Sequence, residues 1–117
     1  QRPQGVGEKL YNRFVTLVGD HYRTNSDVAF YADCLNVSAT YLAQVCHRVG
    51  RLSPKNIIDR QKTRAIANDL LTTDRTVQEI AFANGFSSQA HFSKFFKKQT
   101  GLSPSDYRRQ EHKNQQL

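Results

Sequence analysis

The sequence predicts an all-α protein of about seven helices, in which two helix-turn-helix subdomains are joined by a long linker helix. Three observations support this prediction. Apolar residues recur at helical spacing, whereas the alternation typical of strands is almost absent. Capping residues and helix-ending glycines divide the chain into segments of helical length. Two stretches about fifty residues apart resemble each other, as expected for a structural repeat.

The composition is that of a globular protein and predicts one domain, residues 1–117, built from small subdomains. The chain is 38% hydrophobic and 23% charged. It has no run of about eighteen apolar residues, so a membrane span is excluded. No signal peptide begins the chain, which favours a cytoplasmic, nucleoid-associated protein. The lack of methionine indicates that the chain was cut from a longer protein.

The charge of the chain points to a nucleic-acid partner. The net charge is +7 and the pI is about 9.7, above the value at which a basic domain suggests nucleic acid. Residues 87–101 contain Lys94, Lys97 and Lys98 and no acidic residue. A local basic patch of this kind attracts phosphate groups.

The first half of the chain contains four predicted helices. Residues 6–22 have one apolar face, and Ser26 is a suitable N-cap for a short helix that ends near residue 35. Ser38 caps a helix over residues 39–49, and Ser53-Pro54 begins a long linker helix over residues 54–71. The expected buried residues of the first two helices are Val6, Leu10, Phe14, Leu17, Val18, Val28, Tyr31, Ala32 and Leu35.

The second half contains three more. Thr76-Val-Gln-Glu79 has the pattern of a capping box, and its helix ends near Gly85, which suits the positive φ of a terminating turn. Ser87 or Ser88 begins a helix over residues 88–99, and Ser103-Pro104 begins a short last helix that runs through Tyr107. The predicted parts are therefore a first helix-turn-helix (26–52), a linker helix and loop (53–75), a second helix-turn-helix with a closing helix (76–109), and a polar, frayed tail (110–117).

The repeat relates the two helix-turn-helix segments. Residues 32–54 read ADCLNVSATYLAQVCHRVGRLSP, and residues 81–104 read AFANGFSSQAHFSKFFKKQTGLSP. Val37-Ser38 matches Phe86-Ser87, Leu42 matches Phe92, Cys46 matches Phe96, and both stretches end in Leu-Ser-Pro. Each is a short helix, a tight turn and a second helix, which is the spacing of a helix-turn-helix. A purely structural repeat of two stacked helix pairs is the alternative.

The outer faces of the two second helices favour DNA binding. At 100° per residue, the expected buried residues are Leu42, Val45, Cys46 and Val49 in one helix and Phe92, Phe95 and Phe96 in the other. The opposite faces contain small, polar or basic residues and no glutamate, although a face selected for stability alone usually includes it. These outer faces are Thr40, Ala43, Gln44 and His47, and Ala90, Ser93, Lys94 and Lys97.

The second segment resembles the signature of the AraC/XylS family of transcription regulators. The residues that carry the resemblance are Ile80-Ala81, Gly85-Phe86, His91-Phe92-Ser93, Phe96-Lys97, Gly101-x-x-Pro104 and Tyr107-Arg108. The first segment fits the same family with three departures. Asn36 stands where glycine is common, Cys46 stands where an aromatic residue is usual, and Arg51 is interpreted as a one-residue extension. The resemblance covers roughly residues 26–109.

The resemblance implies a DNA-binding module whose two recognition helices enter successive major grooves of double-stranded promoter DNA. It further implies a transcription activator, with RNA polymerase as a candidate partner. Such a module is usually the C-terminal part of a larger protein, whose other region senses a signal or forms a dimer. We expect that region to lie outside this chain.

Gln44 and Lys94 are the foremost candidates for base contacts, because an amide bonds adenine in two places and a lysine reaches guanine O6 and N7. The full base-contacting set is Thr40, Ala43, Gln44, His47, Ala90, Ser93, Lys94 and Lys97. Phosphate contacts are expected from helix starts and flanking donors; these are Ser38, Arg48, Ser88, Gln89, Lys98 and Arg108. The linker cations Arg60, Lys62 and Arg64 are interpreted as a solvated face.

No metal, cofactor or enzymatic activity is expected. The four histidines are far apart in sequence and match no zinc pattern. Cys46 and His47 are neighbours on one helix and point about 100° apart, so they form no catalytic pair. Cys34 and Cys46 lack CxxC spacing and are interpreted as two buried, reduced thiols. The competing functions are a protein-interaction module and non-specific nucleic-acid binding.

Overall fold

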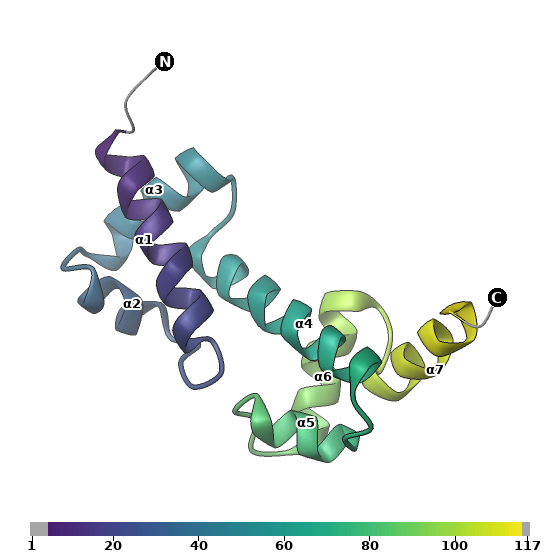
Figure 1. Ribbon diagram of the computed structural model, residues 1–117. Coiled ribbons are helices and arrows are strands. Elements are labelled where there is room, and N and C mark those ends of the chain that lie inside the picture. The colour runs from purple at the N-terminus through teal and green to yellow at the C-terminus, as the bar shows by residue number, and fades with distance from the viewer. Residues whose placement is uncertain (1–4, 116–117) are drawn as a thin grey trace. The chain divides into compact units, whose positions relative to one another are not determined.

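The computed structural model describes the backbone of residues 5–115 and the side chains of residues 5–110, and it is helical throughout (Figure 1). No strand occurs in residues 5–115, so the predicted all-α class is confirmed. The helices of this part of the chain are α1 (Val6–His21), α2 (Val28–Cys34), α3 (Ala39–Gly50), α4 (Pro54–Thr72), α5 (Val77–Ala83), α6 (Gln89–Thr100) and α7 (Pro104–Gln115).

Local capping explains where most of these helices begin. The Thr76 hydroxyl accepts the Glu79 N–H at 3.0 Å, and the Glu79 carboxylate accepts the Thr76 N–H at 2.9 Å, which confirms the capping box. These hydrogen bonds hold the pKa of Glu79 below its usual value. The predicted cap of α2 was wrong by one residue. Asp27, not Ser26, accepts the Ala29 N–H at 3.0 Å, because a carboxylate fits this role as well as a hydroxyl does.

The chain forms two compact units that meet between Gln61 and Lys62, within α4. In the first unit α1 packs against both α2 and α3, so the leading helix is part of the first helix-turn-helix fold. Val6 was expected in this core but is 77% exposed, because it lies in the first turn of α1. Val28 and Leu17 are only half-buried. The buried apolar side chains of α1, α2 and α3 are Leu10, Phe14, Val18, Tyr31, Ala32, Leu42, Val45 and Cys46.

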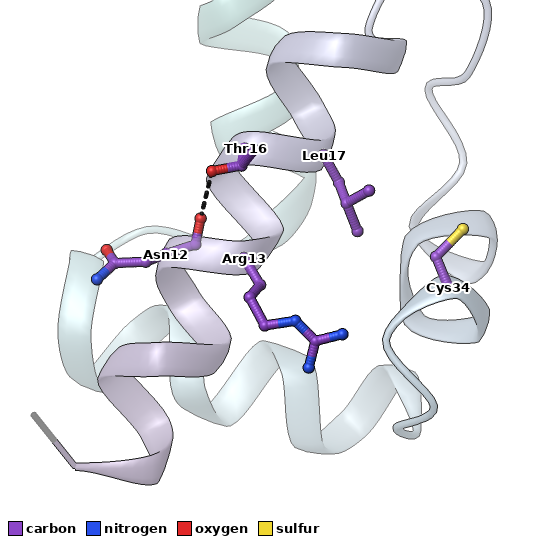
Figure 2. Close-up of a pocket in the computed structure, with 5 residues that line it drawn as sticks. All are labelled: Asn12, Arg13, Thr16, Leu17 and Cys34. Atoms are coloured by element: carbon purple, nitrogen blue, oxygen red, sulfur yellow. Dashed lines mark hydrogen bonds between the residues drawn. The ribbon is translucent and has the colours of Figure 1, made fainter.

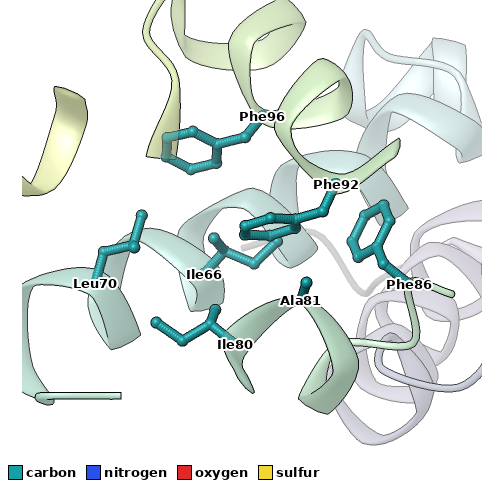
Figure 3. Close-up of a cluster of buried hydrophobic side chains, with 7 residues drawn as sticks. All are labelled: Ile66, Leu70, Ile80, Ala81, Phe86, Phe92 and Phe96. Carbon is teal, nitrogen blue, oxygen red and sulfur yellow. The ribbon is translucent and has the colours of Figure 1, made fainter. Parts of the chain in front are cut away.

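The core of the second unit combines aliphatic and aromatic side chains (Figure 3). Phe92 and Phe96 of α6 stack with ring centroids 6.3 Å apart, and Tyr107 of α7 meets Phe96 edge-on at 5.2 Å. Offset and edge-on pairs of this kind are the favoured aromatic geometries. The buried members of this core are Ile66, Leu70, Ile80, Ala81, Phe86, Phe92 and Phe96.

The last helix is longer than the sequence predicted. We expected a short helix through Tyr107 and a frayed tail from residue 110, but α7 continues to Gln115. Residues 116–117 of the predicted tail lie outside the described residues. The Ser103 hydroxyl accepts the Asp106 N–H at 3.2 Å, which caps the helix start. Arg108 anchors α7 to the end of α4 through two carbonyl oxygens, Leu70 O at 2.9 Å and Thr73 O at 3.2 Å.

The two cysteines occupy different environments, which corrects the expectation that both are buried. Cys46 is fully buried, and desolvation raises the pKa of its thiol to about 11. Cys34 is exposed at the C-terminal end of α2. As Figure 2 shows, it lines a pocket of about 370 Å³ with four residues of α1: Asn12, Arg13, Thr16 and Leu17.

None of the helices in the described part of the chain is both long enough and apolar enough to cross a membrane.

The first prediction concerns the two thiols. A maleimide reagent at neutral pH should modify Cys34 rapidly and Cys46 only when the first unit unfolds, since Cys46 is buried and its pKa is about 11. Mass spectrometry of digested protein, before and after addition of urea, measures the two rates. The Cys34→Ser variant is the control and should show no rapid labelling. Equal rates for the two thiols in native protein would contradict the assigned burial.

The second prediction concerns the aromatic core. The Phe96→Ala variant should lose about 3–5 kcal/mol of the free energy of unfolding of the second unit, because the ring is fully buried between Phe92 and Tyr107. Urea unfolding followed by circular dichroism measures this loss. The matched control is Gln99→Ala on the exposed side of α6, which should change stability by less than about 0.5 kcal/mol. A Phe96→Ala protein as stable as this control would refute the burial of Phe96.

Candidate nucleic-acid interface

The helices α3 and α6, which we call the recognition helices, are built in the same way. Both have 12 residues. Ser38 accepts the Tyr41 N–H at 3.0 Å, and Ser88 accepts the His91 N–H at 3.1 Å, so each helix begins at a serine N-cap. Each ends at a left-handed C-cap, with φ of 62° at Arg51 and 88° at Gly101. The two units therefore present recognition helices of equal length between equivalent caps.

Equivalent hydrogen bonds also align the turns before these helices. Val37 N–H donates to Ala32 O at 3.1 Å, and Phe86 N–H donates to Ala81 O at 3.0 Å. The match of Val37 with Phe86 therefore holds, whereas Ser38 corresponds to Ser88 and not to Ser87 as the sequence comparison assumed. The second turn is one residue longer than the first.

Two departures of the first unit have a simple backbone explanation. Asn36 has φ of 56°, as Gly85 has φ of 84° at the equivalent place, and asparagine is one of the few residues that tolerate this region. Arg51 is not the inserted residue that the sequence suggested, because it occupies the same C-cap position as Gly101. At these two positions the first unit therefore has the same left-handed backbone as the second unit, with Asn36 and Arg51 in place of Gly85 and Gly101.

The outer face of α3 is mostly exposed to solvent. Thr40, Gln44 and His47 are exposed and Ala43 is half-buried, while Leu42, Val45 and Cys46 are buried beneath them. Val49, expected among the buried residues, is half-buried. The helix contains no acidic residue, so nothing on it repels a phosphate backbone.

The outer face of α6 has the same plan with more charge. Ala90, Lys94 and Lys97 are exposed and Ser93 is half-buried, above the buried rings of Phe92 and Phe96. Phe95, expected to be buried, is half-buried at the edge of the core. The three lysines of α6 (Lys94, Lys97 and Lys98) and its lack of acidic residues make this face the more basic of the two.

The predicted phosphate contacts fall into two groups. Ser38 and Ser88 lie at the helix starts, with Gln89 and Lys98 exposed on α6. Arg48 and Arg108 have contacts within the protein instead. The guanidinium of Arg48 lies against Gly7 of α1, and that of Arg108 is bound to the end of α4.

The sequence comparison missed two exposed residues at equivalent positions, Tyr41 of α3 and His91 of α6. Each is the third residue of its helix, and the exposed fraction of Tyr41 is 38%. The His91 ring lies edge-on to Phe86, with centroids 5.5 Å apart. Their spacing of fifty residues was the available signal, because it equals the spacing of the two serine caps.

Two buried polar side chains belong to the second unit. Lys62, interpreted from the sequence as part of a solvated face, is only 6% exposed, whereas Arg60 and Arg64 are exposed as expected. Asn84 is fully buried at the end of α5, where its Nδ2 donates to Ile80 O at 2.9 Å. Its Oδ1 has no hydrogen-bond partner among the described residues. Among the residues with described side chains, no group of three or more His, Cys, Asp and Glu is placed to hold a metal ion.

This arrangement of two capped helix-turn-helix motifs with acid-free, exposed second helices defines a helix-turn-helix DNA-binding module. A family model described as a helix-turn-helix domain matches residues 31–110. The chain belongs to the AraC/XylS family of transcription-regulator DNA-binding domains, which is a family of DNA-binding proteins rather than of enzymes.

Curated relatives include several transcription regulators. The raffinose operon transcriptional regulatory protein RafR of Pediococcus pentosaceus is 29% identical over 99 residues, which are 85% of this chain and 36% of RafR. The regulatory protein SoxS of Escherichia coli (strain K12) is 27% identical over 101 residues, which are 86% of this chain and 94% of SoxS. The chain spans only about a third of the length of RafR and of the melibiose operon regulatory protein.

Solved structures show the same fold. The C-terminal domain of AraT, a response regulator from Geobacillus stearothermophilus, is 30% identical, with a TM-score of 0.82 over 91% of this chain and 88% of that domain. The DNA-binding domain of AdpA, a global transcriptional factor solved in complex with a target DNA, is 23% identical. Its TM-score is 0.79 over 88% of this chain and 93% of the AdpA domain.

The third prediction concerns Asn84. The Asn84→Leu variant should raise the free energy of unfolding of the second unit by about 1–2 kcal/mol, because it removes a buried oxygen that has no hydrogen-bond partner. Urea unfolding measures the change, with exposed Asn68→Leu on α4 as the control for the same substitution. A loss of stability in Asn84→Leu would show that the amide contributes more than its orphaned oxygen costs.

Proposed function

We propose that this chain binds a specific sequence of double-stranded promoter DNA and acts in a bacterial transcription activator. The observation that supports this proposal most directly is the pair of exposed, acid-free faces on α3 and α6, which are equivalent by their caps. Contact with a polyanion requires such a surface, and bases are read by the side chains that project from it.

The two recognition helices enter successive major grooves. The length of α4 supports this part of the proposal, since its 19 residues span about 28 Å at 1.5 Å per residue. One turn of DNA is about 34 Å long, so the length of α4 is compatible with the proposal. A single chain would then read two half-sites.

The base contacts come from the outer faces. Gln44 reads adenine through its amide, and Lys94 reads guanine O6 and N7 from the corresponding position of α6. Ala43 and Ala90 are short enough to touch thymine methyl groups, while Thr40, His47, Ser93 and Lys97 complete the two faces. Because equivalent positions hold different side chains, the two half-sites differ in sequence.

The phosphate contacts come from the starts of the two helices and their flanks. Backbone N–H groups at the N-termini, with Ser38, Ser88, Gln89 and Lys98, bind the DNA backbone. Arg48 also binds phosphate once its guanidinium moves away from Gly7. Arg108 donates two N–H groups to the end of α4, and its remaining N–H groups serve the phosphate contact. The second unit therefore supplies most of the electrostatic affinity.

The complete regulator contains more than this chain, as the lengths of RafR and the melibiose regulator suggest. The missing region senses a signal or holds a dimer together, and RNA polymerase is the partner through which activation occurs. The protein works in the cytoplasm at the nucleoid. In terms of domains, residues 26–52 and 76–109 are the DNA-reading parts and residues 53–75 connect them.

Selection of bound sequences from a random pool of duplex oligonucleotides tests the proposal. Enrichment of one asymmetric site about two half-sites long is the expected result. A gel-shift assay at two salt concentrations should show binding that weakens steeply as salt rises. Absence of salt-sensitive binding would favour a protein-interaction module, and binding without enrichment would show a non-specific binder.

The fourth prediction concerns base readout by the second unit. On the selected site, Lys94→Ala should cost about 1–3 kcal/mol of binding free energy and relax the preference for one base pair under α6. Titration of fluorescent duplexes carrying each of the four base pairs at that position measures both effects. Lys9→Ala, which removes an exposed lysine from α1, is the matched control. Equal weakening on all four duplexes would assign Lys94 to phosphate rather than to a base.

A further inference from the structure

Lys62 occupies a position in α4 where the pattern calls for an apolar residue. Ile58, Ile66 and Leu70 are fully buried, with eight residues between the first two positions and four between the last two. Lys62 lies four residues from both Ile58 and Ile66. Residues spaced by four share one face of a helix. Lys62 is the only charged side chain among those described that is buried.

The Lys62 ammonium contacts the turn that leads into α6. Its Nζ lies 4.9 Å from the centroid of the Phe86 ring, which is the geometry of a cation–π interaction. Phe86 is the third residue after the end of α5, directly after Gly85, in the turn that leads to α6. Lys62 therefore contacts α6 indirectly, through one aromatic ring.

Phe86 transmits this contact to the first two turns of α6. Its ring centroid lies 5.5 Å from that of His91, 5.2 Å from Phe92 and 5.3 Å from Phe95. Any displacement of the Phe86 ring thus changes the support of the N-terminal half of α6. That half carries Ala90, Ser93 and Lys94 of the proposed base-contacting face.

A lysine is a poor choice here for stability alone. Removal of an ammonium group from water is costly even where it has partners. Apolar residues that replace a buried charge together with its partners often stabilise a fold equally well or better. Its charge also has the same sign as the N-terminal end of the α6 dipole and the lysines of that helix. A bound phosphate backbone offsets this repulsion between positive charges, because its negative charge attracts each of them.

Residues 5–61, the described part of the first unit, contain no equivalent of this contact. Val37 stands where Phe86 stands in the second unit, and an aliphatic side chain presents no ring face to a cation. The cation–π contact therefore belongs to the more basic of the two recognition helices.

We propose that Lys62 is a positioning residue for DNA binding. Its ammonium holds Phe86, and with it the start of α6, in the geometry from which the second unit binds DNA, and it does so without benefit to the stability of the free protein. This inference rests on the proposed function, because it assigns a buried residue to the same DNA-binding face.

The test is the Lys62→Met variant, which keeps length and apolar contact and removes the charge. Affinity for the selected duplex should fall by about twofold to thirtyfold, the usual strength of one cation–π contact expressed as a ratio of binding constants. The thermal unfolding midpoint should stay equal or rise. A merely structural residue would instead lower stability and affinity together, and that result, like unchanged affinity, would overturn the proposal.

Two controls make the result specific. Lys62→Arg keeps a cation that stacks on aromatic rings and should restore most of the lost affinity. The slope of log K against log salt should remain that of the wild type in Lys62→Met, whereas removal of a direct phosphate contact, as in Lys98→Ala, lowers it by about 0.9. A Lys62→Met slope lowered by that amount would reassign Lys62 to direct phosphate contact.

If Lys62→Met fails to fold, nuclear magnetic resonance of the wild-type chain still tests whether the contact between Lys62 and Phe86 persists when DNA binds. Shielding by the Phe86 ring should shift the Lys62 ε-methylene protons upfield, and this shift should persist or increase when DNA binds. Loss of the shift on binding would overturn the proposal. Absence of DNA binding by the wild type contradicts the proposed function itself, whereas wild-type binding with an unaffected Lys62→Met contradicts only this inference.

Discussion

The burial of one face of a twelve-residue helix is the constraint on which the rest of the structure depends. In α6 the rings of Phe92 and Phe96 are fully buried, and in α3 Leu42 and Cys46 take the same two places. Because side chains four residues apart share a face, fixing this pair fixes which residues project outward. The buried pair of each helix thus determines which side chains a partner can contact. The serine caps determine where each helix starts.

Local signals made much of the fold predictable from the sequence. The capping box at Thr76 and the caps at Ser38 and Ser88 depend on residues within three positions of each other, so they can be recognised without tertiary information. The outward positions of Gln44 and Lys94 followed from helical periodicity alone. Even the error at Asp27 was local, because two adjacent residues could each serve as the cap.

The features that sequence reasoning missed depend on contacts between distant segments. The sequence predicts Lys62 to be a solvated cation, because it does not show that Phe86 packs against the ammonium. It also does not show that Arg108 donates to the carbonyl oxygens of Leu70 and Thr73. The exposure of Cys34 likewise depends on how α2 packs. Periodicity assigns a residue to a face, but only packing decides whether that face is covered.

The turn of the second unit combines features that do not favour stability. Asn84 buries an oxygen that has no hydrogen-bond partner among the described residues. Gly85 loses more conformational entropy on folding than any other residue type would. Lys62 buries a charge against the ring of Phe86. The equivalent turn of the first unit uses Asn36 and Val37 and places no buried cation. Costs of this kind collect where proteins bind their ligands. Under the proposed function, the second turn therefore exchanges stability for the presentation of α6. This agrees with α6 being the more basic recognition helix, since the two halves of the module are similar in backbone but different in charge.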